Sequence, residues 1–318
     1  CLLRACLGGG GYPRVTASLV ALHATAPYAV WCEAFAPPEA REPAGRYRVL
    51  LAERGKAHET RILGIRHPGL PPLPFPTEEV GFRLALEQMA AGVPALAGLP
   101  LLYFPEGLAG RPDLLEQIEG ISSRFGPYAY RVVEIKSARH LDSADLVQAA
   151  FYNALLGKIQ GVELPSVTLI NRDGQAFEHA MEALRPRLTE ALEGARAILA
   201  GRVAPEPIHG QCPWPWTAFG DSQAEARQDL SLLPGVGKVT RETLRTAGLR
   251  TLGDVAAVEV AVLAGLPRIT AGKARTLRAA ATALLTGNAV RINPGRVPLP
   301  AAPVEIFVDL EGAEAADA

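Results

Sequence analysis

The stretch Tyr130-Arg-Val-Val-Glu-Ile-Lys136 decides the fold of this 318-residue chain and holds its strongest chemistry. On a β-strand successive side chains point to opposite faces, so Glu134 and Lys136 share one face while Val133 and Ile135 share the other. An acid and a lysine two residues apart on one strand can lie over a single reaction centre. An ordinary Glu–Lys pair on a surface strand is the alternative, and this segment alone does not exclude it.

A second carboxylate, Asp113, lies upstream in Gly110-Arg-Pro-Asp-Leu-Leu115. We expect it on a neighbouring strand of the same hairpin or meander. Two adjacent carboxylates repel each other when both are ionised, unless a cation lies beside them. We therefore expect a hard divalent metal, Mg²⁺ or Mn²⁺, to bind at this site. Such an ion can polarise a phosphodiester and acidify a water molecule, while Lys136 orients that water or stabilises negative charge in the transition state.

Two further patterns accompany these residues. Gln148 and Tyr152 stand at positions i and i+4 of a predicted helix just after the strand, so they share one helix face. Upstream, Gly55-Lys-Ala-His58 places an imidazole in the helix that precedes the predicted sheet, where it could complete a metal shell. A lone histidine is more often structural, so His58 gains weight only from the residues around it.

The rest of the chain is consistent with an α/β core followed by smaller units. Capping residues and periodicity predict helices over 16–31, 47–62, 77–91, 143–156 and 182–200. Short strands are expected at 101–104, 110–118, 130–136 and 166–171, with turn residues at 120–127. The expected divisions are an unstructured segment 1–14, an α/β domain 15–201, a connecting segment 202–229, a helical domain 230–292, a Pro-rich linker 293–303 and the start of a further domain at 304–318.

Composition limits the classes of function. Apolar residues make up 48% of the chain and the net charge is −1, so a core can form and no overall charge favours nucleic acid. The longest uncharged stretches contain prolines and polar residues, which argues against a membrane span. Four cysteines do not make a disulfide framework, and no signal peptide is visible, so we expect a cytoplasmic protein. The missing initiator methionine suggests a fragment of a longer chain.

Together, the carboxylates, the Glu-x-Lys strand, the Gln–Tyr helix pair and the upstream Gly-x-x-His resemble the RecB-like branch of the PD-(D/E)XK nucleases. The similarity covers about residues 14–312 and is strongest to bacterial RecB-like nucleases that continue into helix-hairpin-helix motifs and an RNase H-like DEDD domain. It implies a restriction-endonuclease-like core, with a mixed sheet flanked by helices, and a small all-α helix-hairpin-helix domain. The metal ligands implied by the resemblance are His58, Asp113, Glu134 and the carbonyl of Ile135. Lys136 resembles the catalytic lysine, and Gln148 and Tyr152 resemble a substrate-side pair.

Relatives in this branch often carry four cysteines that hold an iron–sulfur cluster. Ala26 stands where the first of them would precede Pro-Tyr, and the later three-cysteine pattern is represented here by His209, Cys212, Trp214 and Ala218. Thiolate ligation needs most or all four cysteines. The spacing of Cys1, Cys6 and Cys32 matches no substitute set. We therefore expect no iron–sulfur cluster and a buried thiol at Cys212.

Glycine-rich segments in the helical region favour phosphate binding. Leu232-Leu-Pro-Gly235-Val-Gly237-Lys238 resembles a helix-hairpin-helix element, in which glycines, a helix N-terminus and a lysine meet a phosphate. A weaker copy lies at 263–273 and includes Lys273. Residues 230–292 hold nine basic and three acidic residues, a local charge of +6 that suits sequence-independent contact with single- or double-stranded DNA. The expected DNA contacts are Gly235, Gly237, Lys238, Arg241 and Lys273. A helical bundle whose glycines are only helix caps is the alternative.

The last residues contain one more acidic pattern. A strand is predicted to begin at 304–310, and in its alternating run 305–311 Asp309 and Glu311 share one face and resemble the first motif of DEDD exonucleases. The other acidic motifs of that activity would lie beyond residue 318, and a polar tail is almost as good an interpretation.

The sequence thus predicts a metal-dependent deoxyribonuclease of DNA repair or processing. Its expected partner is DNA, a helicase is a further candidate partner, and no association with a membrane is expected. One alternative is a non-catalytic DNA-binding protein with a degenerate nuclease fold, and a weaker one is a structural partner of a helicase.

Overall fold

Two ten-residue strands, β5 (Leu114–Ser123) and β6 (Gly126–Ile135), form an antiparallel hairpin at the centre of the larger sheet. Leu114 pairs with Val133, so the start of β5 lies beside the end of β6. The hairpin extends further than expected, because Ser123 pairs with Gly126 across a tight turn, after an irregularity of the ladder between Glu119 and Ser123. In that turn the Phe125 N–H donates to the Ser123 hydroxyl (3.1 Å).

The larger sheet has the strand order β2-β5-β6-β7-β8. Its remaining strands are β2 (Ala95–Ala97), β7 (Ser166–Ile170) and β8 (Ala176–Ala180). β6 and β7 run parallel and the other pairs are antiparallel, so the sheet is mixed. A parallel pair needs a crossover connection, which helix α6 (Ser143–Gln160) supplies. β8 was not expected from the sequence, because its exposed Ala-Phe-Glu-His-Ala run lacks a strand pattern.

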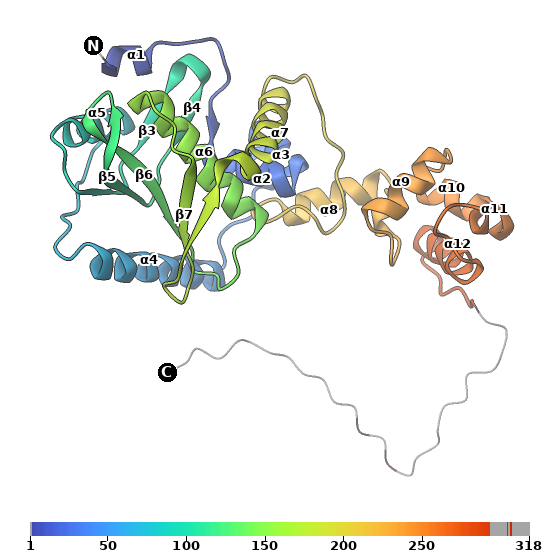
Figure 1. The fold of residues 1–318 in the computed structure, drawn as a ribbon. Coiled ribbons are helices and arrows are strands. Elements are labelled where there is room, and N and C mark those ends of the chain that lie inside the picture. Colours follow the sequence, from blue (N-terminus) through green and yellow to red (C-terminus); the bar gives the residue numbers. More distant parts are fainter. Residues whose placement is uncertain (1, 293–303, 305, 307–318) are drawn as a thin grey trace. The chain divides into compact units, whose positions relative to one another are not determined.

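Helices cover both faces of this sheet (Figure 1). On one face, Ile62 of α4 (Arg46–Arg66) packs against Val133 and Ile135. On the other face, Val132 packs in a larger core with Phe151 and other apolar residues of α6. The alternation expected for β6 therefore separates two packing layers, and Glu134 belongs to the layer of α6.

A second, three-stranded sheet lies in the same unit, with the order β1-β4-β3. Its strands are β1 (Val15–Thr16), β3 (Leu101–Tyr103) and β4 (Leu108–Gly110), with the short helix η2 (Phe104–Glu106) between the last two. Helix α5 (Glu78–Ala90) begins after Thr77, whose hydroxyl accepts the Val80 N–H as the sequence predicted.

The N-terminal segment is more ordered than expected. Residues Leu2–Leu7 form α1, and Cys6 is fully buried in the main core with leucines of the same helix packed beside it. The helix expected over 16–31 is two helices, α2 (Ala17–Thr25) and α3 (Pro27–Phe35). They separate at Ala26, because Pro27 has no N–H to continue α2 and instead suits the first position of a new helix.

One of the remaining helices of this unit precedes the larger sheet in the chain, and the other three follow it. They are η1 (Pro38–Ala40), α7 (Met181–Leu199), α8 (Thr217–Ala226) and η3 (Leu230–Leu232). The segment between α7 and α8 is attached to α3, since the Trp216 indole N–H donates to Glu33 (2.9 Å).

The structure, a computed structural model, describes residues 2–292, 304 and 306, and the chain separates into two compact units, Cys1–Leu232 and Leu233–Ala318. The described part of the second unit is all helical: α9 (Lys238–Thr246), α10 (Leu252–Ala257), α11 (Val260–Ala264) and α12 (Ala271–Thr286). Leu244, Val255, Leu263 and Leu277 are buried. The expected linker 293–303 and the acidic pair Asp309 and Glu311 lie outside the described residues.

The chain therefore has a mixed α/β unit, with helices on both faces of a mixed sheet, followed by a helical unit. This arrangement agrees with the expected α/β class and the order of its two parts. Among the residues that the structure describes, no helix combines the length and the apolar character needed to cross a membrane.

Candidate functional site

Asp113 and Glu134 are held side by side by hydrogen bonds across the β5–β6 hairpin. The Ile135 N–H donates to Asp113 Oδ2 (2.7 Å), and the Asp113 N–H donates to Glu134 Oε1 (3.1 Å). This exchange follows from the register, because Asp113 directly precedes the residue that pairs with Val133. One oxygen of each carboxylate is thus fixed by a backbone donor. The two acids that the sequence placed on neighbouring strands do lie together.

Burial makes the ionised form of this carboxylate pair unfavourable. Glu134 is 2% exposed. Its burial, reinforced by the charge of Asp113, raises the pKa of Glu134 far above the usual range, and Lys136 opposes the shift only in part. Burial also raises the pKa of Asp113, against the N–H of Ile135 and the charge of Lys136. The pair therefore favours holding a proton unless a further cation lies beside it.

Lys136 is the fixed positive charge of the site. Its Nζ lies 3.4 Å from Glu134 Oε2 and 3.5 Å from Asp145 Oδ1, and it donates a hydrogen bond to the side-chain oxygen of Gln148. Burial alone would lower the pKa of Lys136, but Glu134, Asp145 and Asp113 outweigh it and raise that pKa. Lys136 therefore remains an ammonium group that can stabilise negative charge rather than take up a proton.

Gln148 and Tyr152 of α6 extend the site as the helical spacing predicted. Tyr152 is 5% exposed, and burial followed by the charges of Glu134 and Asp113 raises the pKa of its phenol. Its ring reaches the site because Gly110 of β4 has no side chain. A Cβ atom at Gly110 would lie 2.5 Å from Tyr152 Cε1, which is too close for any other residue without displacement of the ring.

His58 does not join the two acids in a group that could hold a metal. It lies on α4, which covers the face of the sheet opposite to the layer of Glu134. Its Nδ1 is 3.2 Å from Arg61 NH2, and its buried Nε2 has no hydrogen-bond partner. Burial and the charge of Arg61 lower the pKa of His58, although the backbone of Asn171 and Lys136 counteracts this in part. The ring is therefore near the ends of β6 and β7, neutral, and without a partner on one nitrogen.

Two acidic residues of this region were missed in the sequence. Glu59 lies close enough to Asp113 for its charge, together with burial, to raise the pKa of Glu59. Asp145 contacts Lys136 and also completes the capping box of α6 with Asp142. The Asp-x-x-Asp spacing before α6 was a visible capping signal, but only the fold brings it to Lys136. Glu59 follows His58 directly, and nothing in its spacing distinguishes it.

The donors fit a hard divalent cation in their chemistry and in part in their geometry. Asp113 and Glu134 offer carboxylate oxygens, the ligands that Mg²⁺ and Mn²⁺ prefer, and the unpartnered Nε2 of His58 is an available nitrogen. Ile135 directly follows Glu134 in the chain, and its N–H already donates to Asp113. Among residues 2–292, however, no three His, Cys, Asp or Glu side chains stand close enough together to enclose a metal ion.

The candidate DNA contacts of the second unit meet at the N-termini of two helices. Gly235 has φ of +72°, a left-handed conformation that glycine adopts without strain, and Gly237 is the N-cap of α9. Lys238 is exposed and Arg241 is half-buried in the first turn that follows. The Lys273 Nζ, near the N-terminus of α12, donates to the Thr240 hydroxyl (2.9 Å). The N-terminal turns of α9 and α12 are therefore neighbours in space.

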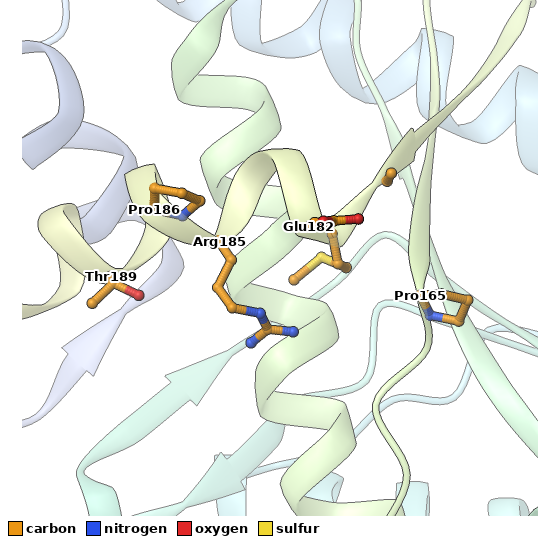
Figure 2. Close-up of a pocket in the computed structure, with 7 residues that line it drawn as sticks. Pro165, Glu182, Arg185, Pro186 and Thr189 are labelled. Atoms are coloured by element: carbon orange, nitrogen blue, oxygen red, sulfur yellow. The ribbon is translucent and has the colours of Figure 1, made fainter.

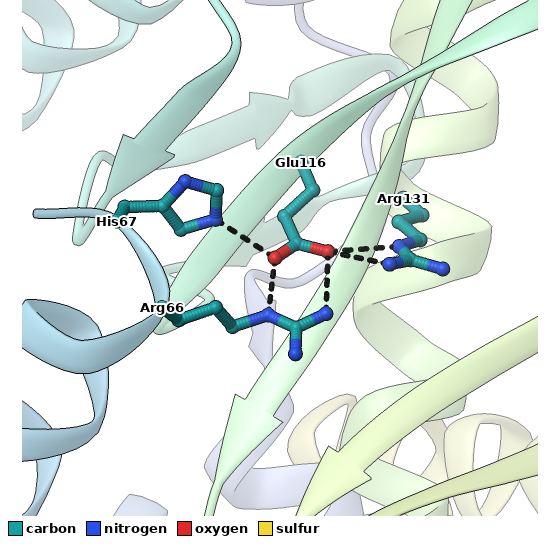
Figure 3. A network of polar contacts seen from close by, with 4 residues as sticks. All are labelled: Arg66, His67, Glu116 and Arg131. Atoms are coloured by element: carbon teal, nitrogen blue, oxygen red, sulfur yellow. Dashed lines mark hydrogen bonds and ion pairs between the residues drawn. The ribbon is translucent and has the colours of Figure 1, made fainter.

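A different polar cluster is buried between α4 and the hairpin (Figure 3). Glu116 of β5 accepts hydrogen bonds from Arg66, from His67 Nε2 (2.8 Å) and from Arg131 Nε and NH2 (2.9 and 2.7 Å). Burial alone would raise the pKa of Glu116, but these hydrogen bonds lower it to about 2. Since every acceptor oxygen is occupied by a cationic donor, the cluster holds α4 to the sheet and is not a reactive site.

A pocket of about 710 Å³ lies elsewhere in the first unit (Figure 2). Arg185 on its wall is ion-paired with Glu163 (2.9 Å). Its lining consists of Pro165, Ala180, Met181, Glu182, Arg185, Pro186 and Thr189. Because none of the predicted site residues lines it, this pocket is not part of the carboxylate–lysine site.

The predicted buried thiol is confirmed, since Cys212 is 6% exposed. It lies in a small apolar cluster that also contains Ala26 and Cys32.

Comparison with models of known protein families and with curated protein sequences finds no match for this chain. The function must therefore be inferred from the geometry of the site itself.

Proposed function

We propose that the chain is a metal-dependent deoxyribonuclease of the RecB-like PD-(D/E)XK type, acting in DNA repair or processing. The observation that carries this proposal is the convergence of Asp113, Glu134 and Lys136 at one end of the β5–β6 hairpin. An ion pair between Glu134 and Lys136 that only stabilised the fold would not need a second buried carboxylate. The second carboxylate raises the pKa of Glu134 and makes ionisation of the site unfavourable unless a further cation is bound.

The residues divide the chemistry among them. Asp113 and Glu134 hold the cation, with the Ile135 carbonyl and His58 as the further ligands implied by the resemblance. When bound there, Mg²⁺ or Mn²⁺ supplies a Lewis acid that polarises a phosphodiester and acidifies the attacking water. For His58 to reach this centre, its ring must turn away from Arg61, and the lack of a partner on Nε2 leaves it able to do so.

Lys136 acts as an electrostatic stabiliser. Because neighbouring carboxylates raise its pKa, it meets the scissile phosphate as an ammonium group and stabilises the charge that develops in the transition state. Gln148 accepts a hydrogen bond from Lys136 and so fixes the direction of Nζ. Tyr152 places a phenol beside the same groups, in the position of a substrate-side residue.

The second unit supplies affinity for DNA as a tandem helix-hairpin-helix module. Glycines at 235 and 237 leave the loop before α9 without side chains that would obstruct a phosphate, and apart from their chain neighbours no described atom lies within 4 Å of where their Cβ atoms would be. Lys238 and Lys273 add full charges at two neighbouring helix N-termini. Such contacts recognise the backbone and not the bases, so binding is independent of sequence.

Cleavage of end-labelled single- and double-stranded DNA in Mn²⁺, compared with the same reactions in EDTA, tests the proposal. The wild-type chain should cleave only with the metal. Lys136→Ala should lose cleavage and keep DNA binding, whereas the matched control Lys158→Ala, on an exposed lysine of α6 paired with Glu106, should cleave normally. Equal cleavage by wild type and Lys136→Ala would refute the assignment of the site.

A non-catalytic DNA-binding protein with a degenerate nuclease site is the second candidate. The orientation of His58 toward Arg61 favours it, because this conformation leaves the cation with two side-chain ligands. Divalent-metal binding separates the two functions, since a degenerate site should not respond to Asp113→Asn. Neither candidate specifies a helicase partner, which a pull-down with the purified chain would identify.

A further inference from the structure

Two cysteines from distant parts of the sequence meet in the first unit. Cys32 belongs to α3, and Cys212 belongs to the irregular segment between α7 and α8. They are 1% and 6% exposed and pack in one apolar cluster. Neither takes part in the carboxylate–lysine site, and the two side chains interact directly with each other.

The surroundings hold this pair in place. Tyr28 and Trp216 are buried in the same cluster, and Gly220 of α8 approaches Cys212 so closely that a Cβ atom there would lie 2.9 Å from Sγ. Cys212 is therefore closed off on the side of α8. By contrast, Cys6, also a buried free thiol, lies in the main core and not in this cluster.

The two thiols are electrostatically unequal. The hydrogen bond from Cys32 lowers the pKa of Cys212, although burial opposes this. The same hydrogen bond, together with burial, raises the pKa of Cys32. Cys212 thus reaches the thiolate form first, and the neighbouring Cys32 keeps its proton. Reaction with an oxidant requires the thiolate, followed by a second thiol within reach to complete a disulfide.

Only non-covalent contacts now join the two segments that carry these cysteines. The Ala218 N–H donates to Glu42 Oε1 (2.7 Å), and the Glu42 N–H donates to the Pro215 carbonyl (2.9 Å). The indole N–H of Trp216 donates to Glu33 (2.9 Å). A covalent link in the middle of these contacts would fasten the segment before α8 to the region around α3.

We propose that Cys32 and Cys212 form a reversible disulfide when the protein meets hydrogen peroxide. The Cys212 sulfur attacks one peroxide oxygen and the O–O bond breaks, which leaves a sulfenic acid and, after protonation, water. The Cys32 sulfur then attacks the Cys212 sulfur, and the S–O bond breaks as the S–S bond forms. The departing hydroxide takes the Cys32 proton as a second water. Two thiols are oxidised by two electrons and one peroxide is reduced to two waters. A small oxidant suits a pair this deeply buried.

The test uses the full chain and does not depend on nuclease activity. One sample is treated with hydrogen peroxide and a second is left untreated. Both are denatured in the presence of N-ethylmaleimide, which blocks free thiols, and their proteolytic peptides are analysed by mass spectrometry. The expected result is a linked Cys32–Cys212 peptide and an intact chain that carries two fewer N-ethylmaleimide groups than the untreated sample. Dithiothreitol added before alkylation should reverse both changes. The matched control Cys6→Ser should still form the link, and Cys32→Ser should not.

Three outcomes would overturn the proposal. Cys32 and Cys212 could both remain alkylated in the treated wild type. The linked peptides could involve Cys1 or Cys6. Oxidation could end at sulfenic or higher acids on separate cysteines. The peptide map of the wild type decides among these outcomes, so the test remains valid even if the Cys32→Ser variant fails to fold.

Discussion

Acid should destabilise the first unit through one carboxylate, that of Glu116 (Figure 3). Arg66, His67 and Arg131 donate to its two oxygens, and these hydrogen bonds overcome burial and lower its pKa from 4.5 to about 2. A difference of about 2.5 pKa units corresponds to about 3 kcal/mol of folding free energy at neutral pH, at roughly 1.4 kcal/mol per unit. Because Glu116 is 5% exposed, solvent screening takes little from this value.

The sign of the effect follows from the direction of the shift. A pKa that is lower in the folded chain gives stability that is fully present above the unfolded value of 4.5. That stability declines as pH falls through the range between about 4.5 and about 2. At about pH 3, less than half of the roughly 3 kcal/mol remains.

Urea unfolding followed by circular dichroism, at pH values from 7 to 3, measures this contribution. Glu116→Gln mimics the protonated side chain, so the variant should be about 3 kcal/mol less stable than wild type at pH 7, and the difference should shrink to about 1 kcal/mol at pH 3. Glu178→Gln, which changes an exposed acid on the edge strand β8, is the matched control and should follow wild type. A wild-type-to-Gln difference that stays constant over this pH range would refute the reasoning.

Three other substitutions test the remaining parts of the molecule. Lys136→Ala should lower the single-turnover rate of DNA cleavage by about 10²–10³-fold, because a buried charge beside the transition state is removed, while Lys158→Ala leaves the rate unchanged. Glu134→Gln should raise the melting temperature in EDTA at pH 8. Because the pKa of Glu134 is raised in the folded chain, its contribution to stability is present at acid pH and is lost as pH rises toward that raised pKa. Glutamine has no ionisable group, so the variant avoids the free energy of burying a charge at pH 8. Lys238→Ala should weaken DNA binding for all sequences alike and lower the slope of log affinity against log salt by about 1.

Each of these expectations has a clear contrary result. A Lys136→Ala rate within a few-fold of wild type would remove the lysine from the chemistry. A Glu134→Gln variant that melts below wild type at pH 8 would mean that the carboxylate stabilises the fold. For Lys238, an unchanged salt slope would show that this residue makes no phosphate contact.

Local pattern was sufficient to predict the centre of the fold. The alternation of Val133, Glu134, Ile135 and Lys136 predicted a strand with a chemical face and an apolar face, and the structure separates them into the layers of α6 and α4. Thr77 was recognised as an N-cap because its hydroxyl can accept a backbone N–H in the first turn. These signals depend on neighbours in sequence, which makes them readable without the fold.

Contacts between distant segments were harder to predict. β8 was missed because its residues are exposed and its pairing comes from β7 and not from its own pattern. The N-terminal residues 2–7 looked unstructured because six residues have no visible periodicity, yet Cys6 is buried by the core. A glycine-rich segment can also extend a ladder, as Gly126 does at the start of β6. In each case tertiary packing decides the structure.

The candidate site divides in the same way. Spacing placed Glu134 with Lys136 on one strand face and Gln148 with Tyr152 on one helix face, and the family resemblance grouped these residues with Asp113. The five side chains lie together, because the hairpin, the residue before it and the following helix carry them. His58 comes from a helix on the other face of the sheet, so sequence order gave no information on whether its ring reaches the acids. Glu59 and Asp145 were missed for the same reason, since only the fold brings them to Asp113 and Lys136.

Calorimetric titration of Mn²⁺ into the purified chain tests most directly whether the two buried carboxylates share a cation. Wild type should show one site that is lost in both Asp113→Asn and Glu134→Gln and kept in Glu178→Gln. Binding should also release a proton from the carboxylate pair, seen as a dependence of the heat on the ionisation enthalpy of the buffer. Equal Mn²⁺ binding by wild type and both site variants would contradict the proposed metal centre.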